Sequence, residues 1–397
     1  MSNKSAPFQS HPTSASAADA TSFVQTNLVS DISGLATVTD ANLINPWGVS
    51  FNATTGSPFW ISDQGSSVTT VYPVTGSTGV TPAVLTVNIP KTAAGPQGPT
   101  GQVSNSNASS FILGDGKAAH FIFADLNGTI SAWDGGPSAT IKWTTPGAVY
   151  TGLAVNQADT MLYAANDKAG TIDVFNSAFT PVNLGAHAFQ TPDAIADRGL
   201  VPFNVTDIGG NVYVTYAPAG HTAQTMAGLG DGAVAVFTES GKLEPHGVLL
   251  GGPLASPWGV AIAPSDFGRF SGDLLVGNFS YLHSEINAFD PRTHKLVGTI
   301  PISVGSGNTP GGLWDLTFGG GGKDGSPSTL YFTDGIDDET HGLLGAIESV
   351  PLGATQQLVD AMASFGSPCA SENSNSPHVD EASRQLPTIS QHVLGLS

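Results

Sequence analysis

Residues 121–134 read FIFADLNGTISAWD: an apolar run ends in aspartate, a short turn follows, and a second run alternates between apolar and polar residues. Runs of β-branched and aromatic residues bounded by Gly, Asn and Asp are typical of strands joined by a tight turn. The same arrangement recurs at residues 161–176 (MLYAANDKAGTIDVFN) and 274–290 (LLVGNFSYLHSEINAFD). The chain therefore contains a repeated antiparallel strand pair.

Looser copies at residues 59–72, 212–237 and 330–350 bring the number of units to six, at intervals of roughly 40 to 60 residues, which is the range of propeller blades. Each unit also has a candidate opening strand, at residues 46–49, 109–112, 151–155, 203–205, 257–260 and 312–316. Outer strands follow in several units, at residues 83–89, 140–144 and 296–302. Four short antiparallel strands per unit predict an all-β fold, a six-bladed β-propeller.

An open ring of blades would expose unpaired strand edges, so the two ends of the chain must meet. We expect the strand at residues 23–29 to pair with residues 345–350 and close the last blade; the alternative is that residues 355–363 fill this place. The predicted organisation is a disordered N-terminal segment (1–22), the propeller (23–352) and a polar C-terminal tail (353–397) that we expect to be disordered.

The composition excludes several classes of function. A formal charge of -19 disfavours nucleic acid and anionic membranes as partners, and it either keeps the protein soluble or attracts cations. One cysteine allows neither a disulfide framework nor a thiolate zinc site, and no apolar run is long enough for a transmembrane segment. The N-terminal residues lack the apolar centre of a signal peptide, so the protein is either cytosolic or a secreted or periplasmic protein whose signal peptide is absent from this sequence. Few lysines and many Gly, Ser, Thr and Asn residues favour the second, and we expect a monomer.

Six motifs, from five of the six units, carry a family resemblance: NPWG (45–48), FADLNG (123–128), TGLA (151–154), SPWGV (256–260), LWDL (313–316) and DGI (334–336). With these motifs the chain resembles the NHL-like six-bladed propellers and, more closely, an uncharacterised family of secreted bacterial propellers. Some members of that family carry a C-terminal PEP-CTERM sorting segment. The resemblance spans about residues 23–351, and residues 352–397 lack the Pro-Glu-Pro start and the apolar stretch of that segment. The resemblance implies no known reaction.

The loops between second and third strands are expected to share one face, at the mouth of the central channel. In the last three units these loops are long, and each carries one histidine: His221, His283 and His341. Histidines from adjacent blades are suitable ligands for a transition metal, with Asp337 or Glu339 as a catalytic carboxylate; the alternative is that each histidine is simply solvated.

A second candidate set is the polar residue near the end of each second strand, which the repeat places in a ring near the channel mouth: Asp63, Asp125, Asn166, Tyr216, Asn278 and Asp334. Such a ring could bind a ligand or calcium, whereas Asp and Asn at strand ends more often cap turns. Trp47, Trp258 and Trp314 open three first strands, and we expect them to wedge between neighbouring blades or to form an aromatic floor.

Two functions remain open. The first is an extracellular or periplasmic scaffold that binds an unknown small molecule or glycan, favoured by a regular repeat without a sharp catalytic motif. The second is a metal-assisted lyase or lactone hydrolase that uses the mouth face, with a divalent metal (calcium or zinc) as cofactor. The fold does not choose between them, because propellers host many functions, so whether the protein is an enzyme stays open.

Overall fold

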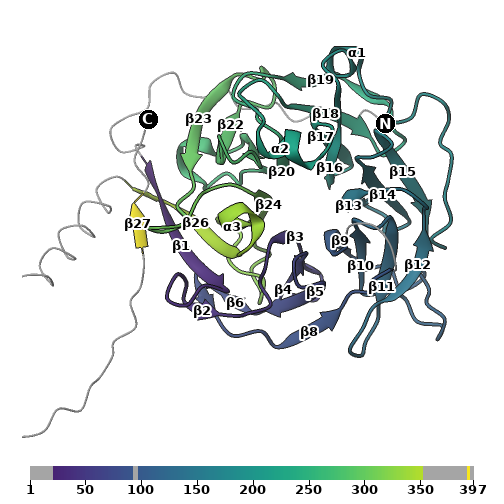
Figure 1. Cartoon of the computed structure of the whole chain (residues 1–397), viewed down its shortest axis with the longest axis horizontal. Coiled ribbons are helices and arrows are strands. Elements are labelled where there is room, and N and C mark those ends of the chain that lie inside the picture. Colours follow the sequence, from purple (N-terminus) through teal and green to yellow (C-terminus); the bar gives the residue numbers. More distant parts are fainter. Residues whose placement is uncertain (1–20, 93–96, 352–390, 394–397) are drawn as a thin grey trace, which may run out of the picture.

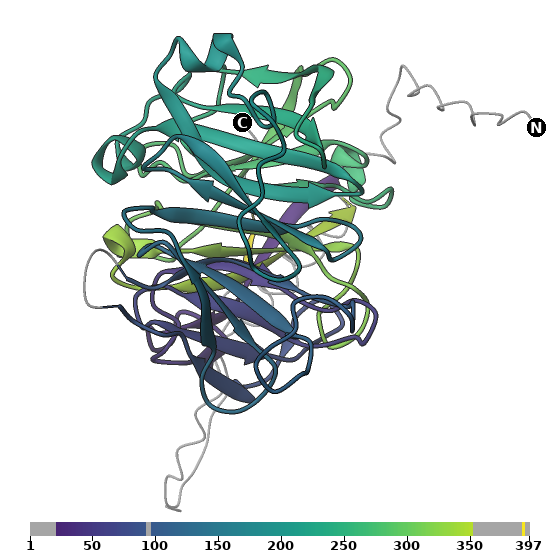
Figure 2. The ribbon, with the colours of Figure 1, turned by 90° about the vertical axis from the view of Figure 1, so that its right-hand side faces the viewer.

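A computed structural model describes residues 21–92, 97–351 and 391–393. Six β-sheets stand around a central axis, as the predicted six-bladed β-propeller requires (Figure 1). Figure 2 shows the same sheets from the side. In the described part of the chain, no helix has the length and apolar character needed to cross a membrane.

Each blade is an antiparallel meander whose first strand lies nearest the axis (Figure 1). Blade I contains β3 (Pro46–Ser50), β4 (Phe59–Asp63), β5 (Val68–Tyr72) and β8 (Leu85–Asn88). Blade II contains β9 (Pro99–Ser104), β10 (Phe121–Asp125), β11 (Thr129–Trp133) and β12 (Thr140–Thr144), and blade III contains β13 (Tyr150–Val155), β14 (Met161–Asn166) and β15 (Thr171–Asn176). Blade IV contains β16 (Leu200–Ile208), β17 (Asn211–Pro218), β18 (Ala233–Thr238) and β19 (Leu243–Leu250). Blade V contains β20 (Pro257–Ile262), β21 (Leu274–Asn278), β22 (Glu285–Phe289) and β23 (Leu296–Pro301).

Blade VI is built from both ends of the propeller. It contains β24 (Leu313–Phe318), β25 (Thr329–Asp334), β26 (Leu343–Pro351) and β1 (Thr21–Ser30). β1 runs antiparallel to β26 from Thr21↔Pro351 to Ser30↔Leu343, which confirms the predicted closure. The side-chain amide of Gln25 imitates a backbone group: it accepts a hydrogen bond from the Ser303 amide (2.9 Å) and donates one to the Ser303 carbonyl. This contact fastens the closing strand to the chain that leaves blade V.

Short elements complete the described chain. They are the two-residue strands β2 (Val38–Thr39), β6 (Val74–Thr75) and β7 (Gly79–Val80), and the helical turns α1 (Asp193–Ala196), η1 (Gly268–Phe270), α2 (His221–Thr225) and α3 (Ile336–Glu339). β27 (Gln391–Val393), in the predicted disordered tail, pairs with β1. The alternative closing segment, 355–363, lies outside the described residues, as do residues 1–20 of the N-terminal segment.

Two details differ from the sequence-based expectation. The first strand of blade II is β9, and the segment at 109–112 is not the opening strand; its Phe111 is instead buried between blades II and III. β9 escaped notice because its sequence, PTGQVS, has few apolar residues. Blade III has three strands rather than four: Val182 bonds the Val174 carbonyl, but the adjacent Pro181 has no N–H with which to continue the ladder.

The apolar core lies between neighbouring sheets. Between blades V and VI, for example, Leu275 and Ile286 share one buried cluster with Leu330 and Phe332. These are alternate residues of their strands, as expected for sheets that pack face to face. The intervening residues are buried as well, against the opposite neighbour, so these strands are recognisable in the sequence as continuous apolar runs.

The first strands touch one another around the axis, and small residues permit the contact. A Cβ atom on Gly48 would lie 2.8 Å from the Thr100 carbonyl oxygen, and one on Gly259 would lie 2.3 Å from that of Trp314. These glycines belong to the two Pro-Trp-Gly-Val motifs, so the motif serves the approach of one blade to the next. Six residues occupy this position, one per blade: Gly48, Gly101, Gly152, Asn204, Gly259 and Asp315.

The two larger members of this set bond the next blade instead of only touching it. Asn204 donates a hydrogen bond to the Trp258 carbonyl of blade V (3.0 Å). Asp315 accepts one from the Val49 amide of blade I (2.6 Å). The inner wall is therefore continuous around the whole axis.

Candidate functional site

The central channel is blocked by aromatic side chains. Trp47 stacks on Trp314 with ring centroids 3.4 Å apart, and Trp258 meets both edge-on, at 6.1 and 5.7 Å. Phe203 and Phe279 complete this buried group, which we call the tryptophan plug. The prediction that the three tryptophans wedge between neighbouring blades was therefore wrong in part, because they meet one another at the axis.

A cavity of about 330 Å³ lies on one side of the tryptophan plug, and we call it the mouth cavity. Trp47 forms part of its wall, and the rest comes mainly from loops between second and third strands and from the segments that enter the blades. The lining residues are Asn45, Trp47, Gln64, Leu126, Val149, Thr151, Asp167, His221, Gln224 and Glu339. The volume falls within the range of small-molecule sites.

Two long loops meet over the mouth cavity. α2 of blade IV supplies His221, whose Nε2 lies 3.1 Å from Oε2 of Glu339 in the loop of blade VI. The Glu339 side chain is 11% exposed, so this contact is largely shielded from solvent on the carboxylate side. The hydrogen bond to Glu339 raises the pKa of His221 above its usual value, despite the opposing effect of burial. The positively charged form of His221 is therefore favoured in the folded protein.

A second polar pair forms the opposite part of the wall. Gln224, one turn after His221 on α2, donates a hydrogen bond to Oδ1 of Asp167 in blade III (2.7 Å). Burial raises the pKa of Asp167, and the bond from Gln224 opposes that rise. α2 thus connects blade III to blade VI across the mouth.

Glu339 is held over the cavity by a strained turn. Asp337, Asp338 and Glu339 have φ values of 53°, 55° and 63°, in the left-handed region that side chains disfavour by roughly 1–2 kcal/mol per residue. Oδ1 of Asp337 anchors the turn by accepting bonds from the amide (2.6 Å) and the hydroxyl (3.0 Å) of Thr309. Strain of this kind clusters at functional sites, where the surrounding structure must maintain it.

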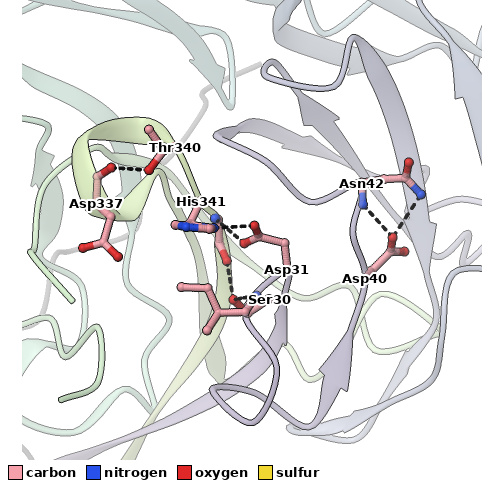
Figure 3. A network of polar contacts seen from close by, with 9 residues as sticks. Ser30, Asp31, Asp40, Asn42, Asp337, Thr340 and His341 are labelled. Carbon is pink, nitrogen blue, oxygen red and sulfur yellow. Dashed lines mark hydrogen bonds and ion pairs between the residues drawn. The ribbon is translucent and has the colours of Figure 1, made fainter. Parts of the chain in front are cut away.

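The three predicted metal ligands do not form a ligand set. His341 lies at the outer side of its loop, where its Nδ1 is 2.6 Å from Oδ2 of Asp31 (Figure 3). His221 faces Glu339, and the backbone amide of His283 bonds the Ser280 carbonyl. Across residues 21–92 and 97–351, no three His, Cys, Asp or Glu side chains are grouped as metal ligands.

The candidate catalytic carboxylates have separate roles in this arrangement. Asp337 is used by the turn itself, through Thr309 and through the Thr340 hydroxyl, which bonds its carbonyl (2.6 Å; Figure 3). Glu339 lines the mouth cavity. Of the two, only Glu339 can therefore contact a molecule in the cavity.

Half of the strand-end ring bonds the segment that leads into the blade. Asp125, Asn166 and Asn278 each accept a hydrogen bond from a backbone amide just before the first strand of their own blade, and the donors are Gly98, Val149 and Ala255, at 3.1, 3.4 and 3.1 Å. Asp125 and Asn166 also accept bonds from the amides of Asn127 (2.9 Å) and Ala169 (3.2 Å) in the turn that follows. The turn-cap alternative therefore describes Asp125 and Asn166. Burial raises the pKa of Asp125 to about 6.

The other members of the ring are buried in different ways. Oδ2 of Asp63 accepts a bond from the Thr70 hydroxyl (2.7 Å), and Tyr216 packs in the apolar core between blades III and IV. Asp334 is fully buried, and neither of its carboxyl oxygens has a hydrogen-bond partner among the described residues. Burial raises the pKa of Asp63 and of Asp334 well above the usual value. None of the six ring residues lines the mouth cavity.

Sequence reasoning did not find Asn45, Gln64, Asp167 and Gln224, which line the mouth cavity. Asn45 stands directly before a Pro-Trp-Gly-Val motif, and Gln64 and Asp167 each follow directly after a strand-end residue. Each of these three residues lies one position away from a motif or strand end that the sequence did reveal, and that position was the signal by which it could have been found. The strand-end residue turns into the blade, and the next one faces the mouth.

Fold and site together define a six-bladed β-propeller with a plugged channel and a mouth cavity whose wall combines apolar and polar side chains. No protein-family model matches the chain. Three curated proteins of Acanthamoeba polyphaga mimivirus are similar to it, and each is named only as an uncharacterized protein. The first is 28% identical over 339 residues (81% of this chain, 78% of the viral protein), and the second is 26% identical over 338 residues (81% and 84%). The third is 25% identical over 262 residues (62% and 46%).

Among solved structures, hydrazine synthase of Kuenenia stuttgartiensis is similar with a TM-score of 0.44 and 13% identity over 76% of each chain. A similarity this low carries no argument about function. The similar curated proteins are viral, so they give no support to the secreted bacterial family or to the PEP-CTERM relationship that the motifs suggested.

Proposed function

We propose that this propeller is a binding protein whose mouth cavity holds a small hydroxylated molecule such as a saccharide. Two cavity-lining side chains carry the proposal. The indole Nε1 of Trp47 is a donor, Oε1 of Glu339 is an acceptor, and neither has a partner among the described residues. Unpaired buried polar atoms are costly, so a ligand that satisfies both would be favoured.

A hydroxyl group suits such a pair because it accepts one hydrogen bond and donates another. The side-chain amides of Asn45, Gln64 and Gln224 line the same cavity. Each already makes a hydrogen bond in the wall, and each keeps a second N–H or lone pair for a neighbouring hydroxyl. No grouping of side chains in the described residues favours the metal-assisted lyase or lactone hydrolase.

Isothermal titration calorimetry with a panel of monosaccharides and disaccharides tests the proposal. The variant is Glu339→Gln, and its matched control is Asp338→Asn, which removes the same charge from an exposed neighbour in the same turn. Loss of a hydrogen bond to a charged group costs about 1.5–3 kcal/mol, so Glu339→Gln should weaken binding roughly 10- to 100-fold. Asp338→Asn should bind like the wild type. Absence of binding across the panel, or equal binding by both variants, would reject the proposal.

A further inference from the structure

A second cavity, of about 240 Å³, lies on the other side of the tryptophan plug, and we call it the lower cavity. Trp258 forms part of its wall, whereas Trp47 belongs to the mouth cavity. The first strands of all six blades, β3, β9, β13, β16, β20 and β24, contribute to the lining. The two cavities therefore share the axis but have separate walls.

Oxygen atoms without partners gather in the wall of the lower cavity. Ser50 Oγ, Gln102 Oε1 and Asp207 Oδ2 are buried and have no hydrogen-bond partner among the described residues. They come from blades I, II and IV. Buried polar atoms in folded proteins are normally satisfied, so three such oxygens around one cavity indicate a missing partner.

The orientation of Gln102 is fixed. Its Nε2 donates to the carbonyls of Gly48 and Trp60, both at 2.7 Å. A flipped amide would place its oxygen against those two carbonyl oxygens, so Oε1 must be the free atom. The residue is 5% exposed. This oxygen is therefore built into the wall and cannot turn to bulk water.

The ionisable side chains that line the lower cavity are all acidic. Asp207 and Asp315 line it, and the described lining residues include no lysine, arginine or histidine. Asp315 accepts bonds from the amides of Val49 (2.6 Å) and Leu316 (2.8 Å), which fix its carboxylate. Asp207 is fixed by the Gly210 amide (2.9 Å) and the Gln157 side chain (2.6 Å). Two carboxylates thus lie in a wall with neutral oxygens and no cation of the protein's own.

We propose that the lower cavity binds a hard divalent cation, calcium, through the Asp207 and Asp315 carboxylates and the neutral oxygens of Ser50 and Gln102. Calcium takes six to eight oxygen ligands in flexible geometry and accepts water among them, so a wall with two carboxylates suffices. The net charge of -19 favours cation uptake. The ion would link the first strands of blades I, II, IV and VI, which carry the four proposed ligands. Without the ion, neighbouring first strands are held together by close packing and hydrogen bonds. The site is independent of the mouth cavity.

The test compares calcium binding by four forms of the full chain, the wild type and three variants, after treatment with EDTA. Ser50→Ala removes a proposed ligand, and Ser62→Ala is the matched control. Ser62 is also a buried serine of blade I whose hydroxyl has no partner among the described residues, but it does not line the cavity. Neither change removes a hydrogen bond between described residues, so both variants should fold. Asp207→Asn is a second variant that removes a charged ligand.

We expect calcium, measured by calorimetry, to bind the wild type and Ser62→Ala alike. Binding should be roughly 10-fold weaker in Ser50→Ala and weaker still in Asp207→Asn. Terbium, a luminescent substitute for calcium, should show emission sensitised by Trp258 in the wild type. Absence of calcium binding, or equal binding by all four proteins, would overturn the proposal and leave water as the occupant.

Discussion

The closest approach between blades offers the sharpest test of the propeller geometry. Gly101 lies in β9 of blade II, against the first strand of blade III. A Cβ atom at this position would lie 2.1 Å from the Leu153 nitrogen and 2.7 Å from the Gly152 carbonyl carbon. Both neighbours are backbone atoms of a strand bonded within its own sheet, so no side-chain rotation can relieve the overlap.

Gly101→Ala must therefore push two blades apart. Overpacking of a core by one methyl group typically costs about 1–3 kcal/mol, and the rigid neighbours here place the change at the upper end, about 3 kcal/mol. Gly114→Ala is the control, because Gly114 has no positive φ and no described atom lies within 4 Å of its added Cβ. Its effect should be below about 0.5 kcal/mol.

Urea unfolding followed by tryptophan fluorescence and by circular dichroism measures both variants. Fluorescence reports the six tryptophans, three of which form the plug, and circular dichroism reports the sheets, so both signals should shift to lower urea together in Gly101→Ala. If Gly101→Ala unfolds within about 0.5 kcal/mol of the wild type, the first strands do not approach one another as described.

Two further predictions concern charge and closure. Burial raises the pKa of Asp315 to about 7, against about 3.9 in the unfolded chain. Between these two pH values the folded protein holds a proton on Asp315 that the unfolded chain has lost. The free energy of unfolding should therefore fall as pH rises from 4 to 7. Asp315→Asn should lose less stability than the wild type between pH 5 and pH 8 in urea titrations, and identical pH profiles would contradict this. Gln25→Ala should lower the free energy of unfolding by about 1–3 kcal/mol, because it leaves the Ser303 amide and carbonyl without partners. The control is Gln190→Ala at an exposed position, which should leave the free energy of unfolding unchanged; thermal unfolding measures both variants.

Much of the fold could be predicted because blades are local structures. A strand, a turn and the next strand lie within about 15 residues, as in β10 and β11, and the runs of β-branched and aromatic residues between Gly, Asn and Asp mark these strands in the sequence. β9 was missed for a physical reason: its residues face the channel and the next backbone, so threonine, glycine and glutamine replace the usual apolar pattern. The residues of a blade's first strand are determined by contacts at the central axis rather than by packing in the apolar core.

The site was harder to predict because contacts between loops depend on the directions in which their side chains point, and the repeat pattern in the sequence does not reveal those directions. The three long loops do lie in the last three blades, but their histidines point in different directions: His221 meets Glu339, and His341 turns outward to Asp31. A repeat predicts which loops share a face, and it does not predict which side chains within those loops meet. Asp125 and its two equivalents in the strand-end ring show the converse, since a repeated local bond produced a repeated residue.

The pairing of β1 with β26 has a consequence for synthesis. The first strand of the propeller to leave the ribosome finds its partner only after residue 351 has been made. At about 5–20 residues per second, the nascent chain carries this apolar strand unpaired for roughly 15–60 s. Blades I to V can form as they emerge, but the last sheet waits for both chain ends. An unpaired strand is a template for wrong association, so the nascent propeller is exposed to aggregation until residue 351 has been made and blade VI can close.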